Sequence, residues 1–472
     1  MRVLVLGGGA REQAIAAALH TAGAEVVVAA ANVNPGLKGI AKDYATIDPT
    51  QPAAVVSVAK SRNVALAVIG PEAPLAAGVG DALRAAEIPV VGPSKAGAQI
   101  ESSKRFCREL LTRHGIDASP RFLAVSNLDE VDARVAELKS AFVVKPVGLT
   151  AGKGVRVMGV DFQTPEEGAA YAKQYLAAHP NEGGILLEEK AEGEEFTLMA
   201  FVTDSGIFPM PVVQDYKRAA EKDTGPNTGG MGSYSQRDHL LPFLSSSMRD
   251  KALDILRRSV EALRSEGIPF RGILYGGYML TARGPVLMEF NARFGDPEAI
   301  NVLTLYEEGD FAELMMGVAT GRVDPNLVQF RLRATAVKYL VAPGYPDKPV
   351  VGGLLTVDEP AIEALGVHVR YGSVDHAGPS QVRLTGSRGI ALVGEASAVH
   401  EAGARVEAAI AHVHGEFQVR HDIASKADLA ARVERMRRMF VPGAKASPLP
   451  LSVAAPDAPP TSYAPMDRRA NA

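Results

Sequence analysis

The chain has 472 residues, more than one hydrophobic core can organise, so we expect three or four domains. It is 47% hydrophobic and 22% charged, like an ordinary globular enzyme, and its net charge of -4 offers no basic excess for nucleic acid or a membrane surface. No apolar run approaches the length of a membrane span. The single cysteine, Cys107, excludes an internal disulfide framework and indicates a reducing, cytoplasmic compartment.

The first hundred residues alternate short apolar runs with helical patterns. We expect strands at residues 2–6, 26–30, 66–70 and 90–91 and helices at residues 11–22, 52–61 and 77–86. This alternation is typical of right-handed crossovers that build a parallel sheet. We therefore expect an N-terminal Rossmann-like α/β domain over residues 1–102.

A different pattern follows residue 103. We expect helices at residues 104–114, 128–140 and 165–178, and strands near residue 122 and at residues 142–145, 155–158, 185–189, 272–280 and 285–290. The last two strands form an expected antiparallel pair, because Arg283-Gly284 between them is a turn signal. We assign residues 103–330 to this central domain.

The last part of the chain changes character again. Strands are expected at residues 334–341, 381–385 and 390–395, and a helix at residues 397–412, which together indicate a small α+β domain over residues 331–438. Residues 446–472 contain six prolines between Pro448 and Pro465 and have no apolar periodicity. We expect this tail to be disordered.

A glycine-rich loop, Gly148-Leu149-Thr150-Ala151-Gly152-Lys153-Gly154, lies between two expected strands. That position, and its spacing, distinguish it from a P-loop, which joins a strand to a helix. Glycines let backbone N–H groups turn toward an anion, and Lys145 and Lys153 would add positive charge. By itself the loop is either a phosphate-binding loop or a plain structural turn.

A later strand end carries Glu289, Asn291 and Arg293 at alternating positions. Alternate residues of a strand point to one side, so a carboxylate, an amide oxygen and a guanidinium would project together. Such oxygen ligands suit Mg²⁺, with water and phosphate completing the shell. Arg293 would neutralise charge on a transferring phosphoryl group. A solvated strand end is the alternative, and it explains this alternation poorly.

Between these segments lies a stretch unusually rich in glycine. It contains Gln214-Asp215-Tyr216-Lys217-Arg218 and then Asp223-Thr224-Gly225-Pro226-Asn227-Thr228-Gly229-Gly230-Met231-Gly232-Ser233-Tyr234. Long glycine-rich loops often carry function, and these N–H groups would wrap a phosphate or carboxylate. A long surface loop is the alternative.

With these motifs in this order, the chain resembles the phosphoribosylamine–glycine ligases (glycinamide ribonucleotide synthetases), ATP-grasp enzymes of purine synthesis. The resemblance extends over about residues 1 to 430. Its further motifs are Gly7-Gly8-Gly9-Ala10-Arg11-Glu12, Gly70-Pro71-Glu72-Ala73-Pro74-Leu75, Gly92-Pro93-Ser94 and Ser103-Lys104. The Gly225 to Gly232 stretch and Arg293-Phe294-Gly295-Asp296-Pro297-Glu298 are the most specific.

The resemblance implies an N-terminal parallel-sheet domain, an ATP-grasp core with a lid subdomain at about residues 118–192, and a small C-terminal α+β domain. It implies that ATP contacts Lys104, Lys145, Gly152, Lys153, Gly154, Glu188, Glu189, Ala191 and Glu195, with the Glu188 to Ala191 backbone at the adenine and Glu195 at the ribose. Glu289 and Asn291 match the ligands of Mg²⁺, with Mn²⁺ as the alternative metal. The substrates would face Gly9, Arg11, Glu12, Asp215, Lys217, Asn227, Thr228, Gly229, Gly230 and Asp296, and the catalytic residues would be Arg293, Lys145 and Asp296.

The implied reaction joins glycine to 5-phosphoribosylamine through glycyl phosphate, with ATP converted to ADP and phosphate. It needs positioning and charge neutralisation rather than a protein nucleophile. The implied partners are small molecules only, without nucleic acid or membrane, and the expected assembly is a monomer or a weak homodimer.

One departure from the family pattern stands near the start, where Gln13 replaces the usual histidine. If that position touches the amine substrate, the acceptor is in doubt. An ATP-grasp paralogue with a different amine acceptor therefore stays open, as does a non-catalytic ATP-binding protein of this fold. A dinucleotide-dependent oxidoreductase is disfavoured, because Glu12 occupies the third glycine position of its fingerprint.

Overall fold

The N-terminal part is built on a five-stranded parallel sheet in the order β3-β2-β1-β4-β5. In the computed structural model, which describes residues 1–150, 154–307 and 309–440, its strands are β1 (Arg2–Leu6), β2 (Glu25–Ala30), β3 (Asp43–Thr46), β4 (Leu66–Ile69) and β5 (Val90–Val91). The helices are α1 (Ala10–Thr21), α2 (Pro35–Ile40), α3 (Pro52–Ser61), α4 (Glu72–Ala77), α5 (Val79–Ala85) and α6 (Gln99–Ser102). β1 and β4 are apolar because both of their faces are covered. The predicted parallel sheet is confirmed.

Several details of this part differ from the sequence-based expectation. The helix expected at residues 77–86 is α5, which begins after Gly78, whose left-handed φ of 86° separates it from α4. The helices α2, α4 and α6 have no counterpart in the expectation. The strand β3 has no counterpart in the expectation, because its four residues include the polar Asp43 and Thr46 and carry no apolar run.

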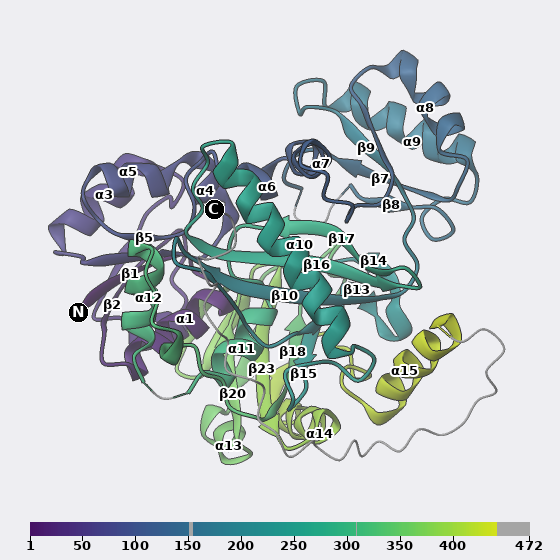
Figure 1. Cartoon of the computed structure of the whole chain (residues 1–472). Coiled ribbons are helices and arrows are strands. Elements are labelled where there is room, and N and C mark those ends of the chain that lie inside the picture. The colour runs from purple at the N-terminus through teal and green to yellow at the C-terminus, as the bar shows by residue number, and fades with distance from the viewer. Residues whose placement is uncertain (151–153, 308, 441–472) are drawn as a thin grey trace.

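The second part is a small antiparallel sheet in the order β6-β9-β7-β8 with two helices beside it (Figure 1). Its elements are β6 (Phe122–Val125), η1 (Leu128–Glu130), α8 (Val131–Leu138), β7 (Phe142–Pro146), β8 (Arg156–Val157), α9 (Pro165–Ala178) and β9 (Ile185–Glu189). It has a hydrophobic core of its own, centred on Phe142, Val144 and Leu187. A separate core lets this unit change its position as one body.

The central sheet has the order β11-β10-β16-β17, and its strands run antiparallel. Its strands are β10 (Glu194–Val202), β11 (Ile207–Pro209), β16 (Gly272–Thr281) and β17 (Gly284–Asn291). The helices of this part are α7 (Lys104–Arg113), α10 (Ser246–Ser265), α11 (Glu298–Leu305) and α12 (Phe311–Thr320), with the short η3 (Pro325–Leu327). A hairpin of β13 (Arg218–Ala220) and β14 (Thr224–Asn227), with η2 (Glu221–Asp223) between its strands, follows Lys217. The antiparallel pair predicted around Gly284 is confirmed.

A third antiparallel sheet, β12-β15-β18-β23-β20, joins strands from the middle and the end of the chain. Its strands are β12 (Gln214–Asp215), β15 (Gly232–Ser235), β18 (Ala334–Val341), β20 (Val367–Tyr371) and β23 (Arg388–Ala396). The boundary at residue 330 stays a prediction, and this sheet holds the two sides of it together.

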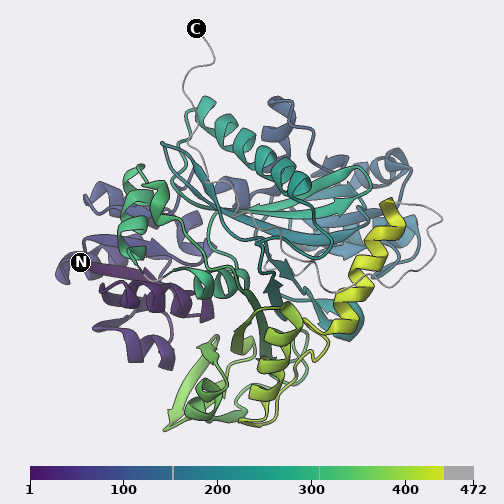
Figure 2. The same cartoon turned by 60° about the horizontal axis from the view of Figure 1, so that its bottom comes forward.

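The remaining elements surround that sheet (Figure 2). They are β19 (Leu354–Val357), β21 (Val374–Gly378), β22 (Gln381–Leu384) and β24 (Val413–Gly415) in the order β21-β22-β19-β24, with α13 (Glu359–Ala364), α14 (Val399–Ile410) and α15 (Lys426–Phe440). The predicted tail at residues 446–472 lies outside the described residues. Within the described ranges, none of the helices has the length and apolar character needed to cross a membrane.

Candidate active site

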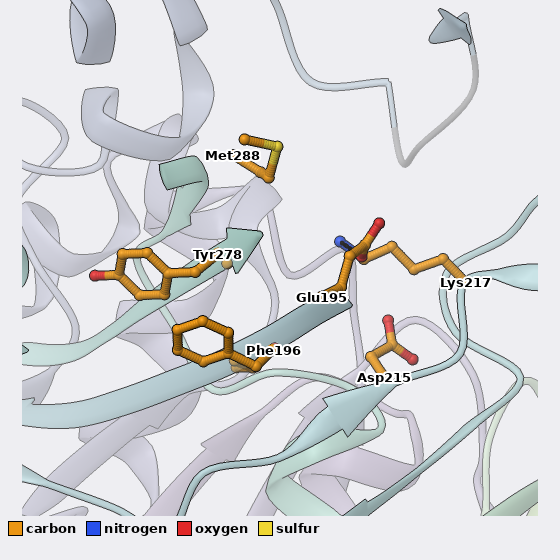
Figure 3. Close-up of a pocket in the computed structure, with 8 residues that line it drawn as sticks. Glu195, Phe196, Asp215, Lys217, Tyr278 and Met288 are labelled. Carbon is orange, nitrogen blue, oxygen red and sulfur yellow. Dashed lines mark ion pairs between the residues drawn. The ribbon is translucent and has the colours of Figure 1, made fainter. Parts of the chain in front are cut away.

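A small pocket, here called the Lys217 pocket, is lined by residues of β10, β12, β16 and β17 (Figure 3). Its lining residues are Glu195, Phe196, Thr197, Asp215, Lys217, Gly277, Tyr278 and Met288. Lys217 Nζ lies 3.1 Å from the Glu195 carboxylate and 3.7 Å from that of Glu289. Burial acts to lower the pKa of Lys217, but Glu195 and the other acids around it raise that pKa well above its usual value. One charged ammonium therefore connects the acid expected at the ribose with an acid expected at the metal.

Glu289 lies among cationic side chains from widely separated parts of the sequence. Burial acts to raise the pKa of its carboxyl, but Lys217, Lys104, Lys145 and Arg293 bring it below the usual value. Lys104, at the start of α7, also donates from Nζ to the Gly148 carbonyl oxygen at 2.9 Å. An ionised carboxylate among several cations suits a place where a divalent metal and phosphate oxygens meet.

Lys145, on β7, is held by a buried network of ion pairs. Its Nζ lies 2.6 Å from one carboxylate oxygen of Glu188, and Arg108 Nε lies 2.7 Å from the other. Burial favours the neutral form of Glu188, yet Arg108 and Lys145 hold its pKa at about 2. Arg108 also donates to the Met288 carbonyl oxygen at 2.7 Å, directly before Glu289. The carboxylate of Glu188 thus serves to position Lys145.

The segment expected at the adenine begins inside the sheet. Glu188 pairs with Phe122 on one side and with Val143 on the other. The N–H of Glu189 donates to the Arg121 carbonyl oxygen at 2.8 Å, and the N–H of Lys190 donates to the Ala141 carbonyl oxygen at 2.8 Å. These two N–H groups are therefore bonded within the protein, and Ala191 is the next residue along the chain.

The glycine-rich loop is described only at its two sides. Gly152 and Lys153, both expected at the phosphates, lie outside the described residues. Gly154 has a φ of 86°, and a Cβ there would approach the Pro146 ring to 3.0 Å, so a larger residue would be strained. Its carbonyl oxygen accepts a hydrogen bond of 2.8 Å from Tyr171 on α9.

Arg293 is surrounded by groups from three segments. Its Nη2 lies 3.1 Å from Glu101 Oε1 and donates to Asn291 Oδ1 at 3.1 Å, and its Nε lies 3.4 Å from Glu72. The other oxygen of Glu101 accepts the Ala292 N–H at 2.7 Å. Burial acts to lower the pKa of Arg293, but the two glutamates raise it. The guanidinium is therefore charged and fixed, and it orients the Asn291 amide oxygen at the end of β17.

Asp215 is a buried acid beside a second one, Glu298. Among the residues that the structure describes, its Oδ1 has no hydrogen-bond partner. Burial and the Glu298 carboxylate raise the pKa of Asp215 well above its usual value, against the lowering effect of Lys217. A Cβ at Gly230 would lie 2.5 Å from that oxygen, and Gly230 has a φ of 108°, so this position requires glycine. An unpartnered buried carboxylate oxygen is a natural acceptor for a small ammonium group.

The long glycine-rich segment is not a free surface loop. Thr228 donates from N and Oγ1 to the Lys217 carbonyl oxygen at 2.7 and 3.0 Å, and its Oγ1 accepts the Gly230 N–H at 3.0 Å. Asn227 lies on β14, where it pairs with Arg218. The segment is thereby folded back onto Lys217, with Gly229 and Gly230 at its far end.

Arg388, at the start of β23, fastens that far end. Its Nη1 donates to the carbonyl oxygens of Gly229 at 2.5 Å and Asp296 at 2.7 Å. Its Nη2 lies 3.3 Å from the Asp296 carboxylate, whose other oxygen accepts the Tyr339 hydroxyl at 2.5 Å. The guanidinium carbon is 4.8 Å from the centre of the Tyr339 ring. Asp296 and the glycine segment are therefore held together by a side chain from the C-terminal part.

The N-terminal motif is also engaged internally. Glu12 accepts the Gly9 N–H at 2.7 Å, which caps α1, and it accepts Arg11 Nε at 2.6 Å. Arg11 further donates to the Phe294 carbonyl oxygen at 3.1 Å. The motif thus connects the first turn of α1 to the segment between Arg293 and Asp296.

Gln13, which left the amine acceptor in doubt in the sequence, is bonded to backbone groups of the C-terminal part. Its Nε2 donates to the Val369 carbonyl oxygen at 3.3 Å, and its Oε1 accepts the Tyr371 N–H at 2.6 Å. The amide therefore pairs with the edge of β20 as a neighbouring strand would, and it is only 5% exposed. Both of its hydrogen-bonding groups serve the contact between α1 and β20.

Several residues of this site carry no sequence signal that points to them. No motif marks Arg108, Glu101 or Arg388, which lie on α7, α6 and β23. Each of them positions another residue of the site. Glu72 stands inside the Gly70 to Leu75 motif, so the motif did mark it, but only the structure pairs it with Arg293.

Three family models together match most of the chain. They are the phosphoribosylglycinamide synthetase N domain over residues 1–101, the ATP-grasp (A) domain over residues 102–299 and the C domain over residues 335–426. The phosphoribosylamine–glycine ligase of Pyrococcus abyssi is 44% identical over 439 residues, which cover 93% of this chain and 98% of that protein. That of Methanoregula boonei is 43% identical over 440 residues, covering 93% and 100%.

Solved structures give the same pattern. The phosphoribosylamine–glycine ligase of Thermotoga maritima superposes with a TM-score of 0.74 at 27% identity, covering 89% of this chain and 100% of that one. A biotin carboxylase of Campylobacter jejuni superposes with a TM-score of 0.67 at 13% identity, covering 92% and 95%. The second likeness concerns the fold alone.

Proposed function

The chain belongs to the phosphoribosylglycinamide synthetase family, and we propose that it ligates glycine to 5-phosphoribosylamine in purine biosynthesis. ATP would phosphorylate the glycine carboxylate to glycyl phosphate, and attack by the amine would release phosphate and form the amide. The family resemblance inferred from the motifs is confirmed, and so is an ATP-dependent ligase.

One observation supports the nucleotide half of this proposal above the others. Lys104, Lys145, Lys217 and Arg293 come from four segments, and all of them lower the pKa of Glu289. Several cations around one ionised acid repel one another. Bound polyphosphate, together with a metal at the acid, would neutralise this charge. In this proposal Lys104 and Lys145 bind phosphate oxygens and Arg293 neutralises the transferred phosphoryl group.

The donor atoms of Glu289 and Asn291 suit a hard divalent cation. Within the described ranges, no group of three or more His, Cys, Asp or Glu side chains is arranged to hold a metal by itself. The carboxylate and the amide oxygen would therefore need phosphate oxygens and water to complete the shell, as Mg²⁺ commonly does. Bound there, the metal would supply charge neutralisation at the phosphates. We propose Mg²⁺ as the ordinary ion, with Mn²⁺ as the alternative.

The acceptor half would be formed by the Asp215 carboxylate and the backbone of the glycine segment. The unpartnered Asp215 Oδ1 is suited to the ammonium group of glycine, and Gly230 leaves the space beside it. Asp296, the Gly9 to Glu12 motif and Asn227 to Gly230 would enclose the phosphoribosylamine. Their fixed geometry would hold the amine in line with the acyl phosphate and exclude water from it.

The direct test is phosphate release from ATP by the purified full chain, with glycine and a panel of amines. We expect release only when glycine and 5-phosphoribosylamine are both present. Equal rates with another amine, and none with 5-phosphoribosylamine, would favour the paralogue with a different acceptor. Failure to release phosphate under any combination, with ATP still bound, would favour the non-catalytic alternative.

Three finer proposals concern the setting of the enzyme. We propose that it acts on small molecules without a nucleic-acid or membrane partner, that it is a monomer or a weak homodimer, and that it works in the cytoplasm. A single cysteine that is buried, with a pKa raised to about 11 by burial, suits a reducing compartment. Sedimentation across a hundredfold range of protein concentration tests the assembly.

A further inference from the structure

The strands that carry the Lys217 pocket have a second, rear side. Neighbouring residues of an extended segment point in opposite directions. Glu195 meets Lys217 in the pocket, whereas Glu194 beside it contacts residues of α15. Asp215 and Lys217 line the pocket, whereas Tyr216 between them contacts Asp428 of α15. Glu195, Asp215 and Lys217 therefore each have an immediate neighbour that is held by the C-terminal helix.

The contact with β10 is an ion-pair cluster around Glu194. One carboxylate oxygen lies 2.8 Å from Arg432 Nη1, and the other lies 2.6 Å from Arg435 Nη1. Gln214, at the start of β12, donates to the same carboxylate at 3.1 Å. Glu194 is 1% exposed, so its charge depends on these partners. Their geometry fixes the position of the backbone from which Glu195 projects.

The contact at Tyr216 consists of two cation–π interactions with its ring. The guanidinium carbons of Arg432 and Arg420 lie 4.4 and 5.0 Å from the ring centre. The Tyr216 hydroxyl donates to Asp428 at 2.5 Å, and Arg432 Nε donates to the same carboxylate at 2.9 Å. The ring is fully buried and lies close to both guanidiniums, so it has little freedom to move. This fixes the backbone that carries Asp215 and Lys217.

Arg432 is the residue common to both contacts. Its third arm, Nη2, lies 2.8 Å from Asp223 at the end of η2, which also pairs with Arg420 at 2.9 Å. One guanidinium thus connects β10, the segment after β12 and the β13–β14 hairpin. A planar fork with several donors can hold three elements in a fixed relation, which a lysine ammonium does less well. Figures 1 and 2 show α15 lying against this side of the central part.

We propose that α15 braces the Lys217 pocket from behind, and that Arg432 is a positioning residue for the binding of a nucleoside triphosphate. The inference rests on the proposed function only in taking this pocket as part of the nucleotide site. In the part of the chain that the structure describes, Arg432 meets Glu194 and Tyr216 rather than a lining residue of the pocket, so its effect passes through these two to Glu195 and Lys217. Nucleotide affinity should therefore respond more than the later chemical step does.

The test compares full-length variants for ATP binding alone, by equilibrium titration, and for steady-state kinetics. We expect Arg432→Met to raise the dissociation constant for ATP about tenfold or more, which corresponds to about 1.4 kcal/mol. The KM for the amine should change less than about threefold, since Arg388 and the Gly9 to Glu12 motif hold that side. Arg432→Lys should recover only part of the ATP affinity. Arg438→Met is the matched control, because Arg438 on the same helix is exposed and pairs with Glu434 one turn away.

A double-mutant cycle separates this role from a loss of stability. If Arg432 acts through Glu194, the variant carrying both Arg432→Met and Glu194→Gln should bind ATP no more weakly than the worse single variant. Unchanged ATP affinity in folded Arg432→Met would overturn the proposal, as would equal rises in every KM. If Arg432→Met does not fold, Arg435→Met decides, because Arg435 is half exposed and contacts the same Glu194. Wild-type protein that binds no ATP would instead contradict the proposed function.

Discussion

The nucleotide side and the acceptor side of the site are built in opposite ways. On the nucleotide side, Lys217 and Glu289 are charged groups, and Lys217 Nζ lies 3.7 Å from the Glu289 carboxylate. On the acceptor side, Arg11, Glu12 and Arg388 have their polar atoms bonded to protein groups, several of them backbone carbonyls. These side chains position the backbone around the ligand. The group that would bind the ligand directly is Asp215 Oδ1, which has no hydrogen-bond partner among the described residues.

This difference indicates what each side contributes. A substitution on the nucleotide side should remove a charge that the ligand uses directly. A substitution on the acceptor side should move a backbone segment and act by misplacement.

The largest effect is expected from Glu289→Ala. Loss of the carboxylate removes a proposed metal ligand and one of the acids that balance Lys104, Lys145 and Lys217. We expect kcat to fall about 10³-fold or more at any practical magnesium concentration. Asp132→Asn is the control, because Asp132 is an exposed acid that pairs with Lys173. Turnover near that of the wild type would remove the metal role from Glu289.

The next effect concerns stability and its dependence on pH. The pKa of Glu188 is about 2 in the folded chain, against an ordinary value of 4.5, so its ionised form stabilises the fold above about pH 4.5. At 1.36 kcal/mol per pKa unit, Glu188→Gln should lower the free energy of unfolding by roughly 3 kcal/mol near pH 7. Because a depressed carboxyl loses its contribution as the pH falls, the difference from wild type should narrow between about pH 4.5 and pH 2.

Urea unfolding of both proteins at several pH values measures that difference. Glu137→Gln is the control, since Glu137 is an exposed acid paired with Arg134 and Arg121. A difference that stays constant or widens toward acid would show that the charge of Glu188 is not what stabilises the network.

On the acceptor side, Arg388→Ala should act by misplacement. It releases Gly229 and Asp296 from each other while leaving the Lys217 pocket intact. We expect kcat/KM for the amine to fall about 10²-fold, with the KM for ATP nearly unchanged. Arg388→Lys should recover part of the loss, and Arg383→Ala, at an exposed position of β22, should change neither value. A parallel rise in the KM for ATP would break the contrast between the two sides.

The smallest effect is expected at Gln13. Gln13→Ala leaves the Val369 carbonyl and the Tyr371 N–H without their partner, which should lower the free energy of unfolding by about 1 to 3 kcal/mol. The ranking of amine acceptors should stay the same in Gln13→Ala and in Gln13→His. Thermal unfolding and the acceptor panel check the two statements, and a new preferred amine in either variant would return Gln13 to the substrate side.

The sequence supports some levels of this structure better than others. Strands such as β9 and β18 and the helix α9 have the predicted bounds, because their apolar periodicity and capping residues are local signals. The parallel sheet also followed from local alternation. By contrast, β12 and β15 join β18 in one sheet across more than ninety residues, and no local pattern specifies which distant strand a short strand will pair with.

The same limit applies to the site. Glu289, Asn291 and the glycine-rich segments stand in compact motifs and were predicted from them. Arg432 is one of many arginines in a charged helix, and only the folded chain shows that its guanidinium meets Glu194, Asp223 and Tyr216. Gln13 is the opposite case. Its departure from the motif suggests a change of substrate, but the structure shows its side chain bonded to β20.

In the proposed reaction, the glycine carboxylate is phosphorylated before the amine attacks. Glycine labelled with ¹⁸O in its carboxylate tests this order, by mass spectrometry of the phosphate formed during turnover with ATP and 5-phosphoribosylamine. Each phosphate released should carry one ¹⁸O atom taken from glycine. Phosphate without the label, formed together with the amide product, would show that the carboxylate is not phosphorylated.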